Sequence, residues 1–501
     1  RERFEGVLLA DRSSAGPLRS PLMARFFRYK TAEALAADAA RLGQAMAFSD
    51  RYEVLFQPLS IGGKRCGNRL AVQPMEGCDG TLDGRPDELT FRRYVRFGAG
   101  GAKLIWGEAT AVSDEGRANP RQLWLSSRSA SAIEEMLARC RRAHRDAFGS
   151  DDDLIVGLQL THSGRYGYRR TLLASHDRLR DPLTIDRASG RPVDESFPLL
   201  SDDDLARIAD DYVAAARLAA KVGVDFVDLK QCHGYLLSEL LAARNRPGRY
   251  GGSFENRTRL VREIIARIRQ ELPSLILATR FNAYDGIPYR RAADGAGEPV
   301  PHSLPLENAF GTDPQDHQKE DLGEPVQLAL WLRDAGVSLL NVSAGIPYTN
   351  PHVVRPADYP PIDGYQPPEH PLLGVLRHFR LARAIQAAVP DLPVVGSGYS
   401  WLQEFAMQAA AANVADGSVA IVGMGRATLA QPDFAKNLRE RGGLDHLRTC
   451  RTFSYCTNLM RSRDHPTGQF PTGCPPFDKE VYGPLWKEAE QKFRDRESRP
   501  I

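Results

Sequence analysis

Eight short apolar segments alternate with longer segments of helical periodicity from about residue 54 onward in this 501-residue chain. Apolar runs of this length are typical of strands buried on both faces. The eight segments are Asn68–Pro74, Ala102–Thr110, Leu154–His162, Val224–Gln231, Leu275–Ala283, Leu339–Gly345, Leu392–Gly398 and Ser418–Arg426. Each of the first seven is followed by a plausible helix, most clearly Asp203–Val222 and Asn256–Leu272, and the eighth is followed by Asp433–Arg441. The pattern predicts an α/β fold whose parallel sheet closes into a (β/α)8 TIM barrel, because an open doubly wound sheet usually has fewer strands.

Two further segments flank this repeat. We predict an N-terminal helical extension over residues 1–50, the barrel over 51–440 and a C-terminal tail packed on the barrel over 441–501. Ala and Leu recur at helical spacing between Thr31 and Met46, which predicts one amphipathic helix. Its apolar face is expected to cover either the outside of the barrel or a partner subunit. A homo-oligomer is therefore one of the two alternatives.

Three of the predicted loops are unusually long. They are Gly164–Leu200, Ile287–Leu322 and Tyr348–Pro371, after the third, fifth and sixth strands. All three leave from the carboxyl ends of strands, so we expect them to lie over the mouth of the barrel. Long loops are more often functional lids or disordered segments than core. Because of where they emerge, at least one is expected to be a lid.

The charge balance argues against large polyanionic partners. The 66 basic and 63 acidic residues give a formal net charge of +3, so neither nucleic acid nor an anionic membrane is an expected partner. We find neither an apolar run long enough to span a bilayer nor an apolar core of a secretory signal near the N-terminus. The seven cysteines are thinly spread, which indicates reduced thiols and a cytoplasmic location.

The most informative motif runs from Cys232 to Leu237 with the sequence CHGYLL, and the block YGGSFENR follows at 250–257. Lys230, His233 and Tyr235 fall where the fourth predicted strand gives way to its loop, and barrel enzymes carry their chemistry at such strand ends. His-Gly-Tyr alone is a weak signal. The two blocks together resemble the Old Yellow Enzyme family of FMN-dependent oxidoreductases, over roughly residues 52 to 440.

This resemblance assigns the ends of the first two strands to the flavin ring. Pro74, Met75 and Glu76 correspond to the positions that run along the ring and offer it backbone groups. Ala109 corresponds to the family's alanine that lies against the flavin. A strand that simply ends at proline is the alternative for Pro74.

The resemblance also assigns two interior polar residues. It implies that Gln159 hydrogen-bonds the pyrimidine edge of the flavin, and a carboxamide does offer that edge both a donor and an acceptor. Arg280 corresponds to the arginine beside flavin N1 and O2, where negative charge accumulates on reduction. A buried arginine needs a negative partner, and an ion pair with a barrel glutamate such as Glu108 is the alternative.

Glycines end the seventh and eighth strands. Gly396, Gly398 and Gly425 allow backbone N–H groups to approach a phosphate closely, and Arg426 can bind it through its fork of donors. Barrel phosphate sites are frequently built from these two loops. The sequence therefore predicts that the FMN phosphate is bound here.

For catalysis the resemblance implies that Tyr235 donates a proton while Lys230 and His233 hold and polarise the substrate's oxygen. The family usually has two histidines, or a histidine and an asparagine, where this chain has Lys230 and His233. A lysine is a point charge, which favours an anionic or strongly oxygenated substrate. Glu76 replaces the family's usual threonine or cysteine, and we hypothesise that it forms a charge pair with Lys230.

No metal is expected. Larger relatives carry an iron–sulfur cluster on four closely spaced cysteines, whereas Cys450, Cys456 and Cys474 do not match that requirement. The sequence thus indicates an NAD(P)H:flavin oxidoreductase that passes hydride from NADH or NADPH through FMN to an activated C=C of a small molecule. Three alternatives remain: a dehydrogenase or demethylase of an amine or saturated ring, a non-redox double-bond isomerase, and a binding protein that has lost its flavin.

Overall fold

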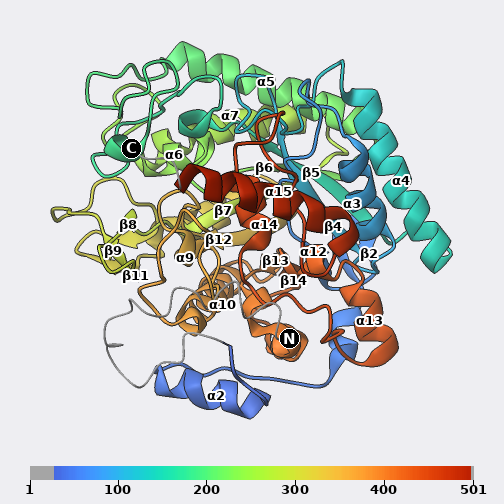
Figure 1. Ribbon diagram of the computed structural model, residues 1–501. Helices are drawn as coiled ribbons and strands as arrows, with labels where there is room; N and C mark the ends of the chain where they lie inside the picture. The colour runs from blue at the N-terminus through green and yellow to red at the C-terminus, as the bar shows by residue number, and fades with distance from the viewer. Residues whose placement is uncertain (1–26, 498–501) are drawn as a thin grey trace.

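The computed structural model describes residues 27–497, and its centre is a closed barrel of eight parallel strands (Figure 1). The strands are β3 (Leu70–Val72), β4 (Leu104–Ala111), β5 (Ile155–Thr161), β6 (Phe226–Leu229), β7 (Ile276–Tyr284), β12 (Leu339–Ala344), β13 (Val394–Gly396) and β14 (Ile421–Met424). They pair in chain order around the barrel, and β14 closes it by pairing with β3. The predicted (β/α)8 barrel and all eight of its strands are confirmed.

Helices surround the barrel, with α3, α4, α5 and α7 around its outer side in Figure 1. The helices that follow successive strands are α3 (Glu88–Gly98), α4 (Ala130–Phe148), α5 (Asp202–Lys221), α6 (Leu236–Ala242), α7 (Phe254–Glu271), α8 (Gly323–Asp334), α9 (Pro351–Val354), α10 (Pro371–Ala388), α11 (Ala406–Ala415), α12 (Ala427–Ala430) and α13 (Phe434–Arg441). Short 3-10 turns lie at Tyr52–Phe56, Gly164–Tyr166, Asp181–Leu183 and Tyr399–Phe405. The two helices predicted most clearly are observed as α5 and α7, and the segment predicted after the eighth strand is observed as α13.

Local sequence explains why α5 begins where it does. The Ser201 hydroxyl accepts a hydrogen bond from the backbone of Asp204, and the Asp204 carboxylate accepts from the Ser201 backbone. This capping box satisfies two donors at the helix start, where acidic side chains also complement the helix dipole. Leu205, Ile208 and Tyr212 are buried at helical spacing against the barrel.

The barrel interior is apolar at its amino-terminal end. Ile155, Phe226, Ile276 and Leu339 belong to one apolar cluster that fills this end. The hairpin of β1 (Leu59–Ile61) and β2 (Lys64–Cys66) adds Ile61 and Cys66 to the same cluster, so it closes the bottom of the barrel. Because side chains on a strand alternate in direction, the next inward positions lie one layer nearer the mouth.

The long loop after β7 contains strands that the sequence did not predict. It forms the hairpins β8 (Tyr289–Arg291) with β9 (Gly297–Pro299), and β10 (Thr312–Asp313) with β11 (Asp316–Glu320). These strands are too short and too exposed to show alternating burial in the sequence. The loops after β5 and β12 carry only short helical turns, and their function as lids stays a prediction.

The N-terminal and C-terminal segments both contact the barrel. Helix α2 (Ala32–Arg41) ends before Gly43, whose φ of +79° favours glycine, so it is shorter than the predicted Thr31–Met46. Its Leu35 is buried in the main core, as expected if the helix covers the outside of the barrel. In the tail, α14 (Tyr455–Arg461) and α15 (Lys479–Glu497) contact each other, and α15 crosses in front of the barrel in Figure 1.

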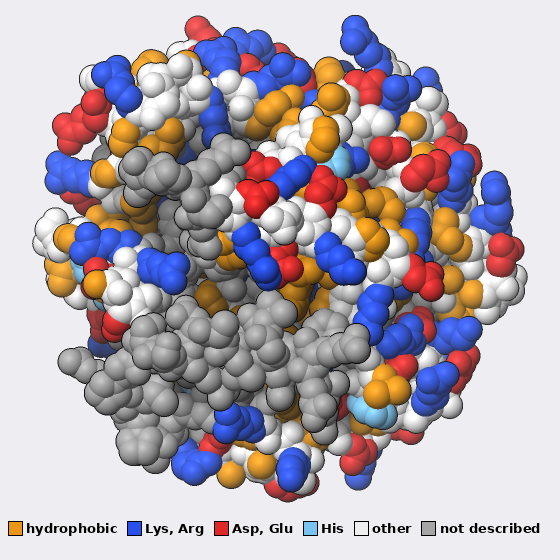
Figure 2. Space-filling view, in the orientation of Figure 1, with side chains coloured by type: hydrophobic (Ala, Val, Ile, Leu, Met, Phe, Trp, Pro, Cys, Tyr) orange, Lys and Arg blue, Asp and Glu red, His pale blue; other side chains and the backbone are white. Residues whose placement is uncertain are grey.

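The surface carries both signs of charge. Basic and acidic side chains are interspersed over the described part of the face in Figure 2, in keeping with the near-neutral net charge (Figure 2). Among the helices between residues 27 and 497, none is long and apolar enough to cross a membrane. The first 26 residues of the predicted N-terminal extension lie outside the described residues.

Candidate functional site

A layer of polar side chains crosses the barrel above its apolar end. Gln73 accepts a hydrogen bond from Asn341 Nδ2 at 2.7 Å and donates through Nε2 to Ser397 at 2.9 Å. On the other side, Gln159 Nε2 donates to Asp228 Oδ2 at 2.6 Å. All of these side chains are buried. The barrel therefore has a polar floor directly below its mouth, and Gln159 is part of that floor.

Arg280 projects from β7 into this layer without a carboxylate partner. It is 9% exposed, its Nη2 donates weakly to Ser343 Oγ at 3.4 Å, and its Nε has no partner among the described residues. Burial lowers the pKa of the guanidinium, although an arginine keeps its charge in proteins. The alternative ion pair with Glu108 is wrong, because Glu108 binds Arg93 at 2.6 Å instead.

Tyr235 caps the start of α6 and lies at the mouth, 4% exposed. Its hydroxyl hydrogen-bonds the Tyr348 hydroxyl at 2.9 Å and donates to Glu76 Oε1 at 3.3 Å. Burial, followed by the neighbouring Glu76 and Tyr348, raises the pKa of the Tyr235 phenol well above its ordinary value. The phenol is therefore protonated at neutral pH and can act as a proton donor.

Lys230 and His233 lie beside Tyr235, as the motif predicts. Lys230 Nζ lies 3.8 Å from the centroid of the Tyr235 ring, and burial lowers the pKa of its ammonium group. His233 has a left-handed φ of +67°, which is uncommon for a residue other than glycine, and its Nε2 lies 2.9 Å from Ser343 Oγ. Burial, Arg280 and Lys230 together lower the pKa of His233 well below its ordinary value, so the imidazole is neutral. A neutral imidazole can donate one hydrogen bond to a substrate oxygen.

Glu76 does not form the direct charge pair with Lys230 that the sequence suggested. Its carboxylate accepts hydrogen bonds from Asn119 Nδ2 at 2.8 Å and Gln122 Nε2 at 3.4 Å, and no ion pair with Lys230 is formed within the described residues. Burial raises the pKa of Glu76, and the charge of Lys230 opposes this at longer range. The direct partners of this carboxyl are therefore two amide groups and the Tyr235 hydroxyl, and not the ammonium group of Lys230.

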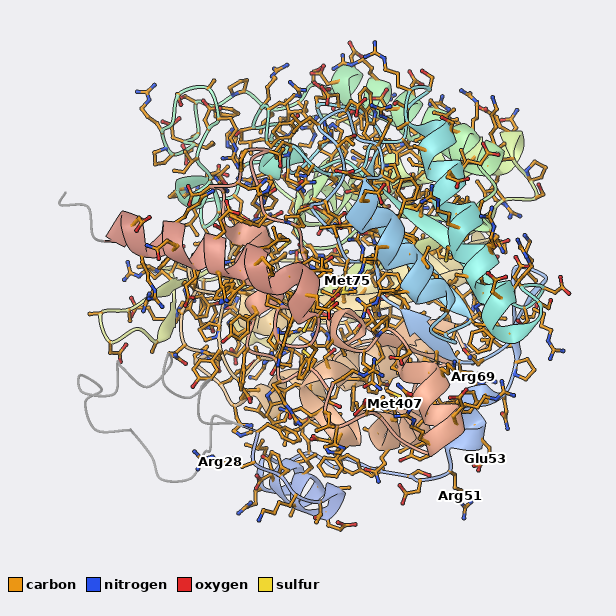
Figure 3. All side chains as sticks on the ribbon, turned by 45° about the vertical axis from the view of Figure 1, so that its right-hand side comes forward. Arg28, Arg51, Glu53, Arg69, Met75 and Met407 are labelled. Carbon is orange, nitrogen blue, oxygen red and sulfur yellow. The ribbon has the colours of Figure 1, made fainter. Side chains whose placement is uncertain are left out.

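The remaining residues predicted beside the ring follow β3 and lie within β4. Pro74 and Met75 are partly buried, and Met75 lies in the middle of the molecule in Figure 3, whereas Arg51 and Glu53 lie at its edge (Figure 3). Ala109 is buried at a register irregularity of β4, and its carbonyl accepts from Gln122 Nε2 at 3.0 Å. These three residues share the end of the barrel at which Tyr235 lies, and their contact with a flavin stays a prediction.

The predicted phosphate loops follow β13 and β14. Gly398 has a φ of +99°, and a side chain at Gly396 would meet Val419 within 2.8 Å. Gly425 has only Gln73 and Met75 atoms at 3.9–4.0 Å where a Cβ would be, so its backbone faces open space. Arg426 Nη2 donates to the Pro356 carbonyl at 2.8 Å, while its Nη1 is buried without a partner in the described part of the chain.

Three further residues at the mouth were missed by the sequence. Tyr348 and Tyr166 stack with ring centroids 4.1 Å apart, and Tyr348 also bonds Tyr235. Arg355 brings a second guanidinium group close to Arg426. All three come from the long loops after β5 and β12, where no periodicity marks individual positions. Only the position of these loops after strand ends could have signalled them.

The donor set of this mouth fits a flavin nucleotide. Among the described residues, buried polar atoms without partners include Arg280 Nε, Thr161 Oγ1 and Asn341 Oδ1 in the polar layer, and Arg426 Nη1 near the glycine loops. A flavin ring edge carries both donors and acceptors, and its phosphate is an anion. By contrast, residues 27–497 contain no group of three or more His, Cys, Asp and Glu side chains placed to hold a metal ion.

Comparison with known protein families gives one match. Residues 54–295 match the model of the NADH:flavin oxidoreductase / NADH oxidase family. An NADH:flavin oxidoreductase of Gibberella zeae is 30% identical over 254 residues, which are 47% of this chain and 58% of that protein. An NADPH dehydrogenase of Bacillus pumilus is 28% identical over 302 residues, 58% of this chain and 73% of the relative.

Solved structures show the same fold. The Old Yellow Enzyme homologue from Zymomonas mobilis aligns with a TM-score of 0.55 and 22% identity over 78% of this chain and 94% of that one. A 2-naphthoyl-CoA reductase aligns with a TM-score of 0.58 and 17% identity, also over 78% of this chain but only 52% of its own. The chain thus spans little more than half the length of the fungal relative and of this reductase.

Proposed function

Because residues 54–295 match the model of the NADH:flavin oxidoreductase / NADH oxidase family, we propose that the chain belongs to this family and uses FMN to pass hydride from NADH or NADPH to an electron-poor C=C of a small molecule. One observation carries this proposal. The protonated Tyr235, the neutral His233 and the ammonium group of Lys230 converge on the same barrel end as the unpaired Arg280.

The proposed cofactor site uses residues that have unused hydrogen-bonding capacity or open space. Arg280 and Gln159 would hold the pyrimidine side of the ring, with Pro74, Met75, Glu76 and Ala109 along it. Gly396, Gly398, Gly425 and Arg426 would hold the phosphate. When bound, FMN supplies hydride chemistry that no side chain can supply.

The substrate would be held by its oxygen. The neutral imidazole of His233 can donate one hydrogen bond to a carbonyl or nitro oxygen, and Lys230 can place a positive charge beside it. Both groups stabilise negative charge as it develops on that oxygen, which makes the conjugated alkene more electrophilic. A cationic group in this position favours an anionic or strongly oxygenated substrate.

The proton would come from Tyr235. As hydride reaches the β-carbon, the phenol O–H gives its proton to the α-carbon and leaves a phenolate. Tyr348 is 49% exposed and hydrogen-bonds Tyr235 at 2.9 Å, so it links the phenolate to solvent for reprotonation. Glu76, with its raised pKa, lies on the other side of the same hydroxyl.

We also propose a cellular location and partners for the protein. All seven cysteines are free thiols, which supports a reducing, cytoplasmic location. The partners proposed are the small-molecule substrate and the nicotinamide coenzyme. We also propose that the protein can form a homo-oligomer, and we assign no interface to it.

Tyr235→Phe tests the proposed function. We expect reduction of the bound flavin by NADH or NADPH to be unchanged, while reoxidation by an enone slows by about 10²- to 10⁴-fold, the usual contribution of a general acid. Anaerobic stopped-flow absorbance measures the two half-reactions separately. Reduction of the flavin by amines and not by either coenzyme would favour the dehydrogenase alternative, and turnover without coenzyme consumption the isomerase.

A further inference from the structure

Two arginines from different loops meet next to the glycine loops. Arg426 follows β14, and its Nη2 donates to the carbonyl of Pro356 at 2.8 Å. Arg355 precedes that proline and ends α9, and its Nη1 donates to Thr457 Oγ1 of α14 at 3.0 Å. The loop after β12 and the C-terminal tail thus place the Arg355 guanidinium beside that of Arg426.

Within residues 27–497, neither of these two guanidinium groups forms an ion pair with a carboxylate. Arg355 Nε and Nη2 and Arg426 Nη1 are buried without any hydrogen-bond partner among the described residues. Burial, Arg461 and Arg426 together lower the pKa of Arg355. Both side chains are only partly buried, but these three nitrogen atoms are shielded from solvent. Two positive charges side by side with shielded donors are unfavourable unless an anion lies between them.

The neighbouring Arg461, by contrast, has hydrogen-bond partners within the protein for both of its terminal nitrogen atoms. Its Nη1 binds Asp363 Oδ1 at 2.5 Å, and its Nη2 donates to the Pro347 carbonyl at 2.6 Å. Asp363 is the nearest carboxylate in the sequence after Asp358, and it is therefore already paired with Arg461 and not with Arg355. Asp358 itself accepts from Trp401 Nε1 at 2.7 Å and from the backbone of Phe27 at 3.1 Å.

We propose that Arg355 and Arg426 together bind the phosphate of FMN, so that Arg355 is a second phosphate ligand supplied by the loop after β12. This inference rests on the proposed function. A phosphate monoester carries nearly two negative charges and three acceptor oxygens at neutral pH. These oxygens match the free Nε and Nη2 fork of Arg355 together with Nη1 of Arg426. Arg355 thereby makes the site selective for FMN over riboflavin, which has the same ring and no phosphate.

Binding measurements on flavin-free protein test this directly. FMN and riboflavin are titrated separately, with flavin fluorescence as the readout, against wild type, Arg355→Gln and Arg355→Lys. We expect Arg355→Gln to weaken FMN binding by about 10- to 150-fold, the range for a lost charge-assisted hydrogen bond, and to leave riboflavin binding unchanged. Arg355→Lys should weaken FMN binding less than Arg355→Gln does, because lysine keeps the positive charge but lacks the two parallel donors of a guanidinium group. Riboflavin binding shows that each variant is folded.

Arg461→Gln is the matched control. It removes a guanidinium group from the same region, but one whose partners lie within the protein, so FMN binding changes by no more than about fivefold. In wild type, inorganic phosphate should compete with FMN and not with riboflavin.

The outcomes separate the two proposals. If wild type binds FMN but Arg355→Gln keeps the same preference for FMN over riboflavin, the inference is overturned and the proposed function stands. This result would also be seen if the two arginines bound a phosphate of the coenzyme or of the substrate. If wild type binds neither flavin, both proposals fail.

Discussion

Two sets of arginines lie in and around this barrel, and they differ in what surrounds their guanidinium groups. Arg93 contacts Asp79 and lies 2.6 Å from Glu108, so it bridges two carboxylates. Arg165 likewise lies 2.6 Å from Asp181 and 2.7 Å from Glu239. In both clusters the positive charge is met by negative charge from the protein itself.

Arg280, Arg355 and Arg426 form the second set. None of these three arginines forms an ion pair within residues 27–497. Arg93 and Arg165 also have a buried Nε without a partner among the described residues, so it is the ion pairs that distinguish the two sets. All three arginines of the second set come from strand ends or loops at the mouth, whereas the paired clusters connect α3 to β4 and the loop after β5 to α6. The partners of a guanidinium group, and not its burial, therefore distinguish the two roles: the closed clusters stabilise the fold, and we propose that a ligand completes the open set.

The strongest test of the closed clusters is Arg165→Met. Removing this side chain leaves Asp181 and Glu239 buried without their partner, so we expect the free energy of unfolding to fall by about 3–5 kcal/mol. Urea denaturation of flavin-free protein measures this quantity. An unchanged free energy of unfolding would mean that the closed clusters do not stabilise the fold. The proposed difference between the two sets of arginines would then be contradicted.

The pH dependence of stability provides a second test. Burial and the nearby Asp79 raise the pKa of Glu108 to about 7, although Arg93 opposes this. In the unfolded chain a glutamate has a pKa of about 4.3. Between these values the folded protein holds a proton that the unfolded chain has lost, so stability falls as the pH rises from about 4.5 to about 7.

Glu108→Gln should remove this fall, which amounts to as much as about 3 kcal/mol. Urea denaturation at several pH values, with wild type alongside, measures the slope. The same slope in wild type and Glu108→Gln would show that Glu108 carries no extra proton, and would contradict the interpretation of the Arg93 cluster as a charge-balanced unit.

Arg280→Met tests whether an arginine of the open set binds the flavin. We expect both FMN and riboflavin to bind about 10- to 150-fold more weakly, because this arginine is proposed to contact the ring that the two share. The flavin-free protein should lose no stability, since the variant removes an uncompensated buried charge. A large loss of stability in the flavin-free protein would place Arg280 among the structural arginines.

The eight strands could be predicted because each is buried on both faces, so its apolar run is nearly continuous. The motif residues Lys230, His233 and Tyr235 could be placed together because all three follow one strand. The resemblance assigned Gln159 and Arg280 to the barrel interior, and both side chains are buried there.

The loop residues could not be predicted in the same way. Tyr348 and Arg355 lie in a proline-rich loop whose course depends on contacts with the tail, such as that of Arg355 with Thr457. The hairpins after β7 are too short to produce a pattern, and the partner of Glu76 depends on Asn119 and Gln122 from another loop. Such contacts are set by tertiary structure and leave no periodic trace in the sequence.

The central claim is that the open arginines are completed by FMN, which then accepts hydride from a nicotinamide coenzyme. The most direct measurement is the visible spectrum of the purified protein, with mass analysis of the flavin released, followed by anaerobic titration with NADH and with NADPH. The account predicts bound FMN whose visible absorbance is bleached by at least one of the two coenzymes. A colourless protein that takes up no FMN, or a bound flavin that neither coenzyme reduces, would contradict it.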